Sequence, residues 1–264
     1  MTNLISQTFK NKEKKLVTFI TGGDPDLDTS LKIIKTLISN EVDMIEIGMP
    51  FSDPMADGPT IQLSSNRAIS KGINLENIFT LAAEAKKIKS DLPIILMGYY
   101  NLILFFGIEN FVYQCKKNGV DGLIIVDLQP EEDEDLINEL KNNQIDLIRL
   151  ITPTTDEERL KLILKNASGF LYYVSVMGIT GQKSANLNEL KKSITIIKKY
   201  TKLPVIPGFG IKNSTDVYNI CKISDGAVVG SSIIKIVEEN LNNEGKMLSE
   251  INEFAKDLKN GTKV

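Results

Sequence analysis

The sequence predicts an α/β protein, a single (β/α)8 barrel domain over residues 1–264. Eight short apolar runs alternate with segments whose apolar residues recur every three or four positions, as strands alternating with amphipathic helices do. Two runs, 123–126 and 227–229, are almost wholly apolar, which favours buried parallel strands. No Ser-rich or Pro-rich linker divides the chain. These observations favour a TIM barrel over an open doubly wound sheet, whose glycine-rich nucleotide turn after the first strand is missing.

The sequence begins with a polar segment. Within it, the spacing of Leu4, Ile5 and Phe9 predicts one face of a short N-terminal capping helix. Amphipathic helices are expected between most strands, for example at 131–142 and 187–200. Four units open on an aspartate just before or at the start of a strand, in Val42-Asp43, Val120-Asp121, Ile145-Asp146 and Ser224-Asp225. The eight strands are expected at 16–20, 43–48, 94–98, 122–126, 147–151, 169–174, 205–208 and 227–230.

Two connections are too long for ordinary strand–helix loops, and they follow the second and sixth strands. One runs from Gly48 to a helix beginning near Leu75, and the other from Ser175 to Asn186. Long loops on the catalytic face of a barrel are usually lids or binding loops. We therefore expect the site at the carboxyl ends of the strands.

Composition excludes several classes of function. A net charge of −3 leaves no footprint for nucleic acid or an anionic membrane, and the longest apolar run, 102–106, is far too short to span a bilayer. The start of the chain has no signal-peptide core, so we expect a cytoplasmic protein. Cys115 and Cys221 offer neither a disulfide framework nor metal spacing. Because the chain has no histidine, Ser-His and Cys-His nucleophile pairs and histidine-ligated metals are excluded.

The acid-bearing stretch 43–61 is the candidate catalytic segment. Strand alternation puts Ile45 and Ile47 on one face and Glu46 on the other, inside the barrel near the carboxyl end of its strand. An isolated buried carboxylate is costly, so it gains hydrogen bonds or holds its proton to unusually high pH, and either suits an acid–base group. A salt-bridged or solvent-facing glutamate on an edge strand is the alternative. The following loop, which carries Asp53 and Asp57, favours catalysis.

Three glycine-bearing segments end the later strands and predict a phosphate site. They are 178–181, 208–210 and 230–232, and helices are expected soon after the last two. Free backbone N–H groups at a helix start bind an anion without arginine or lysine, which fits a mildly acidic protein. Any one segment alone is more typical of a simple turn, but their convergence favours binding.

The string EIGMPFSDPMADGP, from Glu46 to Pro59, resembles the signature of the tryptophan synthase alpha subunit family. The resemblance covers nearly the whole chain. It includes Gly22-Gly23-Asp24-Pro25, Tyr99-Tyr100-Asn101, Gly178-Ile179-Thr180-Gly181 and Pro207-Gly208-Phe209-Gly210-Ile211. The segment 175–178 departs from the pattern, because it lacks an arginine found in this loop of some relatives.

The resemblance implies a lyase of tryptophan biosynthesis that cleaves indole-3-glycerol phosphate into indole and glyceraldehyde 3-phosphate. Glu46 is then the general acid–base, and Asp57 accepts a hydrogen bond from the indole N–H. Glu46, assisted by Tyr172, is one candidate base for the glycerol hydroxyl. Asp53 is expected to fix the loop, and Asp127 to support a loop or contact a partner. The implied substrate-binding residues are Phe19, Tyr99 and Tyr172 for the ring, and Gly181, Phe209, Gly210, Gly230 and Ser231 for the phosphate.

The family also implies an α2β2 complex in which indole passes to a tryptophan synthase beta subunit. Pyridoxal phosphate is expected in that partner, and no cofactor or metal in this chain. The expected docking rim combines the loop 50–59 with the loops around Tyr99 and Asp127. Two other functions stay open from the residues, another phosphate-binding barrel isomerase or synthase, and a mainly regulatory subunit.

Overall fold

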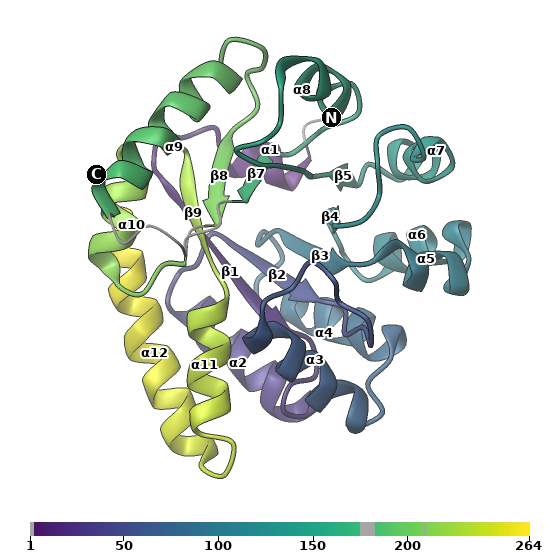
Figure 1. Ribbon diagram of the computed structural model, residues 1–264. Helices are drawn as coiled ribbons and strands as arrows, with labels where there is room; N and C mark the ends of the chain where they lie inside the picture. Colours follow the sequence, from purple (N-terminus) through teal and green to yellow (C-terminus); the bar gives the residue numbers. More distant parts are fainter. Residues whose placement is uncertain (1–2, 175–182, 209) are drawn as a thin grey trace.

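The computed structural model describes residues 3–174, 183–208 and 210–264. Within these ranges nine strands, all paired in parallel, form a nearly closed barrel with the helices outside it (Figure 1). The TIM-barrel prediction is confirmed. The strands are β1 Lys15–Thr21, β2 Met44–Gly48, β3 Ile94–Gly98, β4 Gly122–Ile125, β5 Asp146–Leu147, β6 Arg149–Ile151, β7 Leu171–Val174, β8 Val205–Gly208 and β9 Gly226–Val229.

The fifth expected strand is present in two parts, which explains nine strands in place of eight. β5 pairs with β4 and β6 pairs with β7, so this one stretch contacts both of its neighbours. Ile148, between the two parts, donates its N–H to the carbonyl of Leu123 at 2.9 Å. The stretch 146–151 therefore brings the two ends of the sheet together.

The helices confirm most of the sequence pattern and correct two parts of it. α3 occupies a stretch that was expected to be loop, so the segment after β2 is 49–58 rather than the whole of 49–74. α9 begins at Lys183, earlier than the expected 187. The helices are α1 Leu4–Thr8, α2 Leu27–Ser39, α3 Pro59–Ser70, α4 Leu75–Ile88, α5 Tyr100–Phe106, α6 Ile108–Lys117, α7 Glu134–Asn143, α8 Glu157–Leu164, α9 Lys183–Ile197, α10 Ser214–Cys221, α11 Ser231–Glu239 and α12 Glu244–Asn260.

α3 was not predicted from the sequence because the side chains on its inward face are small and mostly polar. Ser64, Ser65 and Ala68 are its buried residues, and Pro59 stands at its first position, where a missing N–H costs nothing. Side-chain contacts fix it instead. Arg67 forms two hydrogen bonds of 2.8 Å with the carboxylate of Asp24 in the connection after β1.

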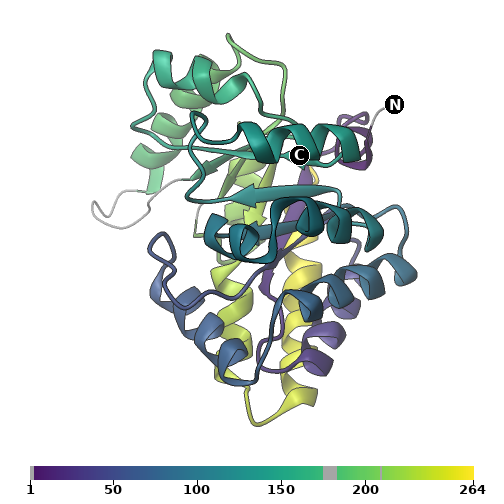
Figure 2. The ribbon, with the colours of Figure 1, turned by 90° about the vertical axis from the view of Figure 1, so that its right-hand side faces the viewer.

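The barrel interior is a separate apolar cluster, distinct from the larger layer between strands and helices. β1 contributes Val17, β2 contributes Met44, and α1 inserts Ile5 at the N-terminal end. In Figure 2, α1 (purple) and α3 (blue) lie at opposite ends of the barrel. The remaining members are Ile95, Ile124, Ile148, Phe170, Ile206 and Val228. In the described residues, no helix combines the length and apolar character needed to cross a bilayer.

The repeated aspartates hold the N-terminal end of the barrel together. Asp43, Asp121 and Asp225 each accept a hydrogen bond from a backbone N–H near the start of a neighbouring strand, at 2.8, 2.8 and 2.7 Å. Each also pairs with a lysine from the helical layer: Lys259 with Asp43, Lys86 with Asp121 and Lys198 with Asp225, at 2.6 to 2.7 Å. The fourth aspartate, Asp146, is buried, and its polar neighbours are Ser168 and Asn3. Three of the four repeated aspartates therefore have the same structural role.

Candidate active site

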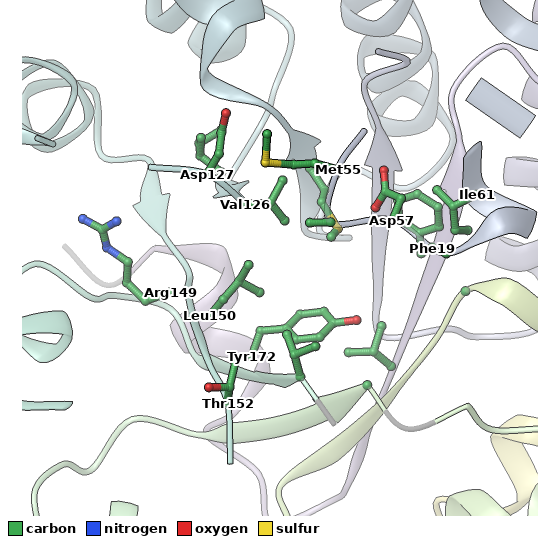
Figure 3. Close-up of a pocket in the computed structure, with 18 of the residues that line it drawn as sticks. Phe19, Met55, Asp57, Ile61, Val126, Asp127, Arg149, Leu150, Thr152 and Tyr172 are labelled. Atoms are coloured by element: carbon green, nitrogen blue, oxygen red, sulfur yellow. The ribbon is translucent and has the colours of Figure 1, made fainter. Parts of the chain in front are cut away.

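A cavity of about 1050 Å³ opens at the carboxyl ends of the strands, where the sequence places the site. Its walls come from the ends of β1, β3, β4 and β6 to β9 and from residues 55–58 (Figure 3). Six of the predicted site residues line it, namely Phe19, Asp57, Tyr172, Gly210, Gly230 and Ser231. Gly181 and Phe209 lie outside the described residues.

Glu46 is completely buried in β2, on the same face of the strand as Met44 and opposite Ile45 and Ile47. Neither of its carboxyl oxygens has a hydrogen-bond partner among the described residues. Burial raises the pKa of this carboxyl to about 8, so the group is protonated at neutral pH. It does not itself line the cavity, but its register partner on β1, Phe19, does.

Asp57 stands at the end of segment 49–58, immediately before α3. Its N–H donates to the carbonyl of Pro54 at 3.0 Å, and its carbonyl accepts from the side chain of Gln62 at 2.9 Å. The anchored helix α3 therefore fixes one side of this residue. Burial raises the pKa of the Asp57 carboxyl, and a hydrogen bond from the Tyr99 hydroxyl opposes that shift.

Tyr172 lies near both carboxyl groups. Its pKa is raised well above the usual value by burial of the phenol and then by the nearby charges of Glu46 and Asp57. Figure 3 shows its hydroxyl pointing to the side of the cavity occupied by Asp57 and Phe19. A Cβ atom at position 208 would lie 2.4 Å from this hydroxyl, so Gly208 leaves the room that the phenol occupies. The structure thus brings Glu46, Asp57 and Tyr172 to one site.

The start of α11 forms the end of the cavity that suits a phosphate. Gly230 and Ser231 line it, and the helix has no side-chain cap and no acidic residue in its first turn. Its free N–H groups and dipole favour an anion. α10 differs, because the side chain of Asn213 caps it. Gly210 lies at φ +53°, a left-handed conformation that favours glycine.

Tyr99 is not among the residues that line the cavity. Its side chain is 3% exposed and contacts segment 49–58 instead. Asp127 accepts the N–H of Tyr100, the first residue of α5, at 2.8 Å, which fits the loop-supporting role expected for it. Asp53 contacts the hydroxyl of its neighbour Ser52 within the same segment.

A polar region of the cavity was not predicted. Arg149, a buried residue of β6, donates to the carbonyl of Leu128 at 3.0 Å and pairs with Asp133. Arg159 from α8 pairs with Glu131, so both arginines hold the connection between β4 and α7. Figure 3 shows the Arg149 guanidinium pointing away from Tyr172. The one signal in the sequence was a lone charged residue between apolar residues of a strand.

No group of three or more Asp, Glu, Cys or His side chains in the described ranges is arranged to hold a metal ion. Cys115 and Cys221 are buried free thiols. Among the described residues, the cavity wall carries the carboxyl groups of Asp57 and Asp127, the phenol of Tyr172 and the start of α11, and Glu46 is buried beside Phe19. The side chains of Arg149 and Arg159 also line it.

Comparisons with known proteins show the family of the chain. The family model described as tryptophan synthase alpha chain matches residues 5–263. The tryptophan synthase alpha chain of Petrotoga mobilis is 47% identical over 255 residues, covering 97% of this chain and 98% of that protein. That of Geotalea uraniireducens is 43% identical over 264 residues, covering 98% of each.

Solved structures support the same assignment. The tryptophan synthase subunit alpha of Legionella pneumophila superposes with a TM-score of 0.92 at 32% identity and covers 99% of both chains. A structure from Aquifex aeolicus gives a TM-score of 0.89 at 35% identity, covering 98% of this chain and 99% of the other. The fold, the cavity and the full-length match lead to one conclusion: the chain belongs to the tryptophan synthase alpha chain family.

Proposed function

We propose that this chain is the alpha subunit of a tryptophan synthase and cleaves indole-3-glycerol phosphate into indole and glyceraldehyde 3-phosphate, with Glu46 and Asp57 as its catalytic carboxyl groups. The observation that carries the proposal is the pair of carboxyl groups in different surroundings beside one cavity, with Tyr172 near both. Two such groups fill opposed acid and base roles at one pH.

Glu46 supplies the proton that makes indole a leaving group. Its carboxyl is protonated at neutral pH, and its oxygens have no other partner among the described residues. Transfer of this proton to C3 of the ring places positive charge on the ring nitrogen. The carbon–carbon bond then breaks with its electron pair moving to the ring, which restores neutral indole.

Asp57 stabilises the charge that develops on the ring nitrogen. As a carboxylate it accepts the N–H hydrogen bond, which strengthens as the ring becomes cationic. Its place on the cavity wall beside Phe19 puts it within reach of a flat ring seated there. Phe19 and Tyr172 then contact the faces of that ring.

Loss of the proton from the glycerol hydroxyl completes the reaction and leaves an aldehyde. After protonating C3, Glu46 is ionised and becomes a base beside the same cavity. We assign this second transfer to Glu46 with the assistance of Tyr172, whose hydroxyl lies nearby. The reaction consumes no oxidant, reductant or cofactor, because one proton enters at C3 and one leaves the hydroxyl.

The substrate phosphate is held at the end of the cavity formed by α11. Gly210, Gly230 and Ser231 carry this role, together with Gly181 and Phe209, which lie outside the described residues. Backbone donors bind the phosphate without a nearby arginine or lysine, so the net charge of −3 is no obstacle.

The partner is a tryptophan synthase beta subunit in an α2β2 complex, and pyridoxal phosphate belongs to that partner. The proposed docking rim comprises segment 49–58, Tyr99 with the helix α5 that follows it, and the connection after β4. It exposes Met55 (85%), Leu104 (53%) and Phe105 (93%), large apolar side chains that a partner would cover. A cytoplasmic complex also fits the two free cysteines.

An assay of the purified chain tests the proposal. The chain is incubated with indole-3-glycerol phosphate, alone and with a beta subunit, and indole and glyceraldehyde 3-phosphate are quantified. We expect equal amounts of the two products and faster turnover in the complex. Absence of indole under both conditions would refute the assignment. Replacement of Phe105 by Asp should abolish co-elution with the beta subunit while activity of the isolated chain persists.

A further inference from the structure

Tyr99 contacts the catalytic segment 49–58 at three points. Its ring stacks on Phe51, with ring centroids 5.1 Å apart and an interplanar angle of 28°. Its hydroxyl oxygen accepts the backbone N–H of Ala56 at 3.0 Å. The same hydroxyl lies near the carboxylate of Asp57 and lowers the pKa of that carboxyl. One side chain therefore joins the beginning of the segment to its end.

The rest of the segment has few fixed points. Within it, the N–H of Met55 donates to the carbonyl of Asp53 at 2.9 Å and the N–H of Asp57 to that of Pro54 at 3.0 Å. Both bonds are local turns, which do not place the segment relative to the barrel. Met49, at its start, donates to the carbonyl of Met97 in β3 at 2.8 Å. Tyr99, two residues after Met97, extends this attachment to the far end of the segment.

The backbone of Tyr99 is itself held firmly. It follows β3 directly and precedes α5, whose first N–H, that of Tyr100, donates to Asp127 at 2.8 Å. Asp127 follows β4, the neighbour of β3 in the barrel. The phenol is thus presented to the segment by two adjacent strands.

We propose that Tyr99 is a positioning residue for the reaction, which holds Asp57 in place through segment 49–58 and does not contact the substrate. Its hydroxyl fixes both the carboxylate of Asp57 and the preceding peptide, and its ring fixes Phe51. This inference rests on the proposed role of Asp57 and replaces the ring-contacting role that the family resemblance implied for Tyr99. A rotation of the carboxylate away from the ring nitrogen would weaken its transition-state contact.

The Tyr99 hydroxyl also favours the ionised form of Asp57. Among the described residues, the titratable groups near Asp57 are Tyr99 from the β3–α5 connection and Tyr172 from β7, and Tyr99 in turn lies near Asp127. Both of these neighbours are phenols, so neither forms an ion pair with the Asp57 carboxylate. The hydroxyl of Tyr99 lowers the pKa of Asp57 against the effect of burial, so its removal moves that pKa upward.

The test compares Tyr99→Phe, Asp57→Asn and the double variant in the complex with a beta subunit, with indole release as the readout. Tyr99→Phe keeps the stacked ring and removes the hydroxyl alone. Tyr113→Phe, the same change at a side chain of α6 that is 59% exposed, is the matched control. We expect Tyr99→Phe to lower kcat about 5- to 50-fold, as for loss of a hydrogen bond to a charged group, and to leave the affinity for indole nearly unchanged.

Two further readouts separate positioning from general damage. The acid limb of the kcat/KM profile of Tyr99→Phe should move to higher pH, because the loss of the hydroxyl raises the pKa of Asp57. In the Asp57→Asn background, Tyr99→Phe should have no further effect on kcat. Losses that multiply in the double variant, or an unshifted acid limb, would overturn this inference alone. Full activity of Asp57→Asn would overturn the proposed role of Asp57 and the inference with it.

Discussion

Three repeated aspartates at the N-terminal end of the barrel and the two proposed catalytic carboxyl groups at the C-terminal end have opposite surroundings. At the N-terminal end, Asp43, Asp121 and Asp225 each have a lysine and a backbone N–H as partners. At the C-terminal end, Glu46 has no partner among the described residues, and Asp57 has the hydroxyl of a neutral phenol. The side chains at both ends are carboxylic acids, so the difference between them comes from the groups that surround them.

The difference assigns the two ends different tasks. A partly buried carboxylate with a cation and a backbone donor is satisfied, so it adds stability and has nothing left to offer a substrate. A buried carboxyl without partners costs stability and keeps its proton and lone pairs available. The same barrel therefore gains stability at one end and gives some up at the other, as is common where a site needs unsatisfied groups.

Replacement of Glu46 by Gln should lower catalytic activity without lowering the stability of the fold. We expect turnover to fall about 10²- to 10⁴-fold, the range for loss of a general acid–base. The folded-state pKa of Glu46, about 8, lies above the ordinary value of 4.5, so its contribution to stability is complete below pH 4.5 and is lost as pH rises to about 8. At pH 8 the Gln variant should thus melt no lower than the parent in a thermal scan. If the Gln variant turned over as fast as the parent, Glu46 would not be the general acid–base.

Replacement of Asp43 by Ala should have the converse result. The N–H of Leu16 loses its carboxylate acceptor and Lys259 its ion pair, so the free energy of unfolding should fall by about 1–3 kcal/mol. The kcat of the folded enzyme should stay the same. Urea denaturation followed by circular dichroism measures the loss. Asp28→Ala, which breaks the exposed pair with Lys32, should leave the midpoint nearly unchanged.

The pH profile should sharpen the contrast between the two catalytic groups. Glu46 must be protonated to act, so kcat/KM should fall about tenfold per unit above a pKa near 8. Asp57 must be ionised, so activity should also fall on the acid side, at a pH higher than for an ordinary aspartate because burial raises its pKa. Indole release in buffers of constant ionic strength gives the curve. In Asp57→Asn the acid limb should disappear, and its persistence would mean that another group causes it.

The sequence was sufficient for the features that depend on local pattern. Eight apolar runs located the barrel strands, and the period of two put Glu46 on the inner face. α3 was missed because its buried face consists of serines and an alanine rather than an apolar stripe. The strands were predicted and α3 was missed for the same reason: an element can be predicted from the sequence when its apolar residues recur at a clear period.

Partners brought together by the fold were beyond the sequence. The aspartates before the strands were visible as a repeat, but their lysines lie in distant helices and follow no fixed spacing. Tyr99 was assigned to the substrate by resemblance, whereas its contacts are with Phe51, Ala56 and Asp57 across about 40 residues of chain. Such pairings are set by tertiary packing, and no periodicity reports them.

The smallest effect is expected where stability and function compete at the start of α11. Ser231→Asp adds a negative charge at the first residue of the helix, which the dipole favours by about 0.3–1 kcal/mol. The same charge repels the substrate phosphate, so KM should rise about tenfold with kcat little changed. Ser231→Ala, which keeps the backbone N–H, should change KM less than about threefold, because the proposed phosphate contact is made by the main chain. An unchanged KM in the Asp variant would place the phosphate elsewhere in the cavity. A higher melting temperature together with weaker substrate binding would show that the start of α11 lacks a stabilising acidic residue because it binds the substrate phosphate.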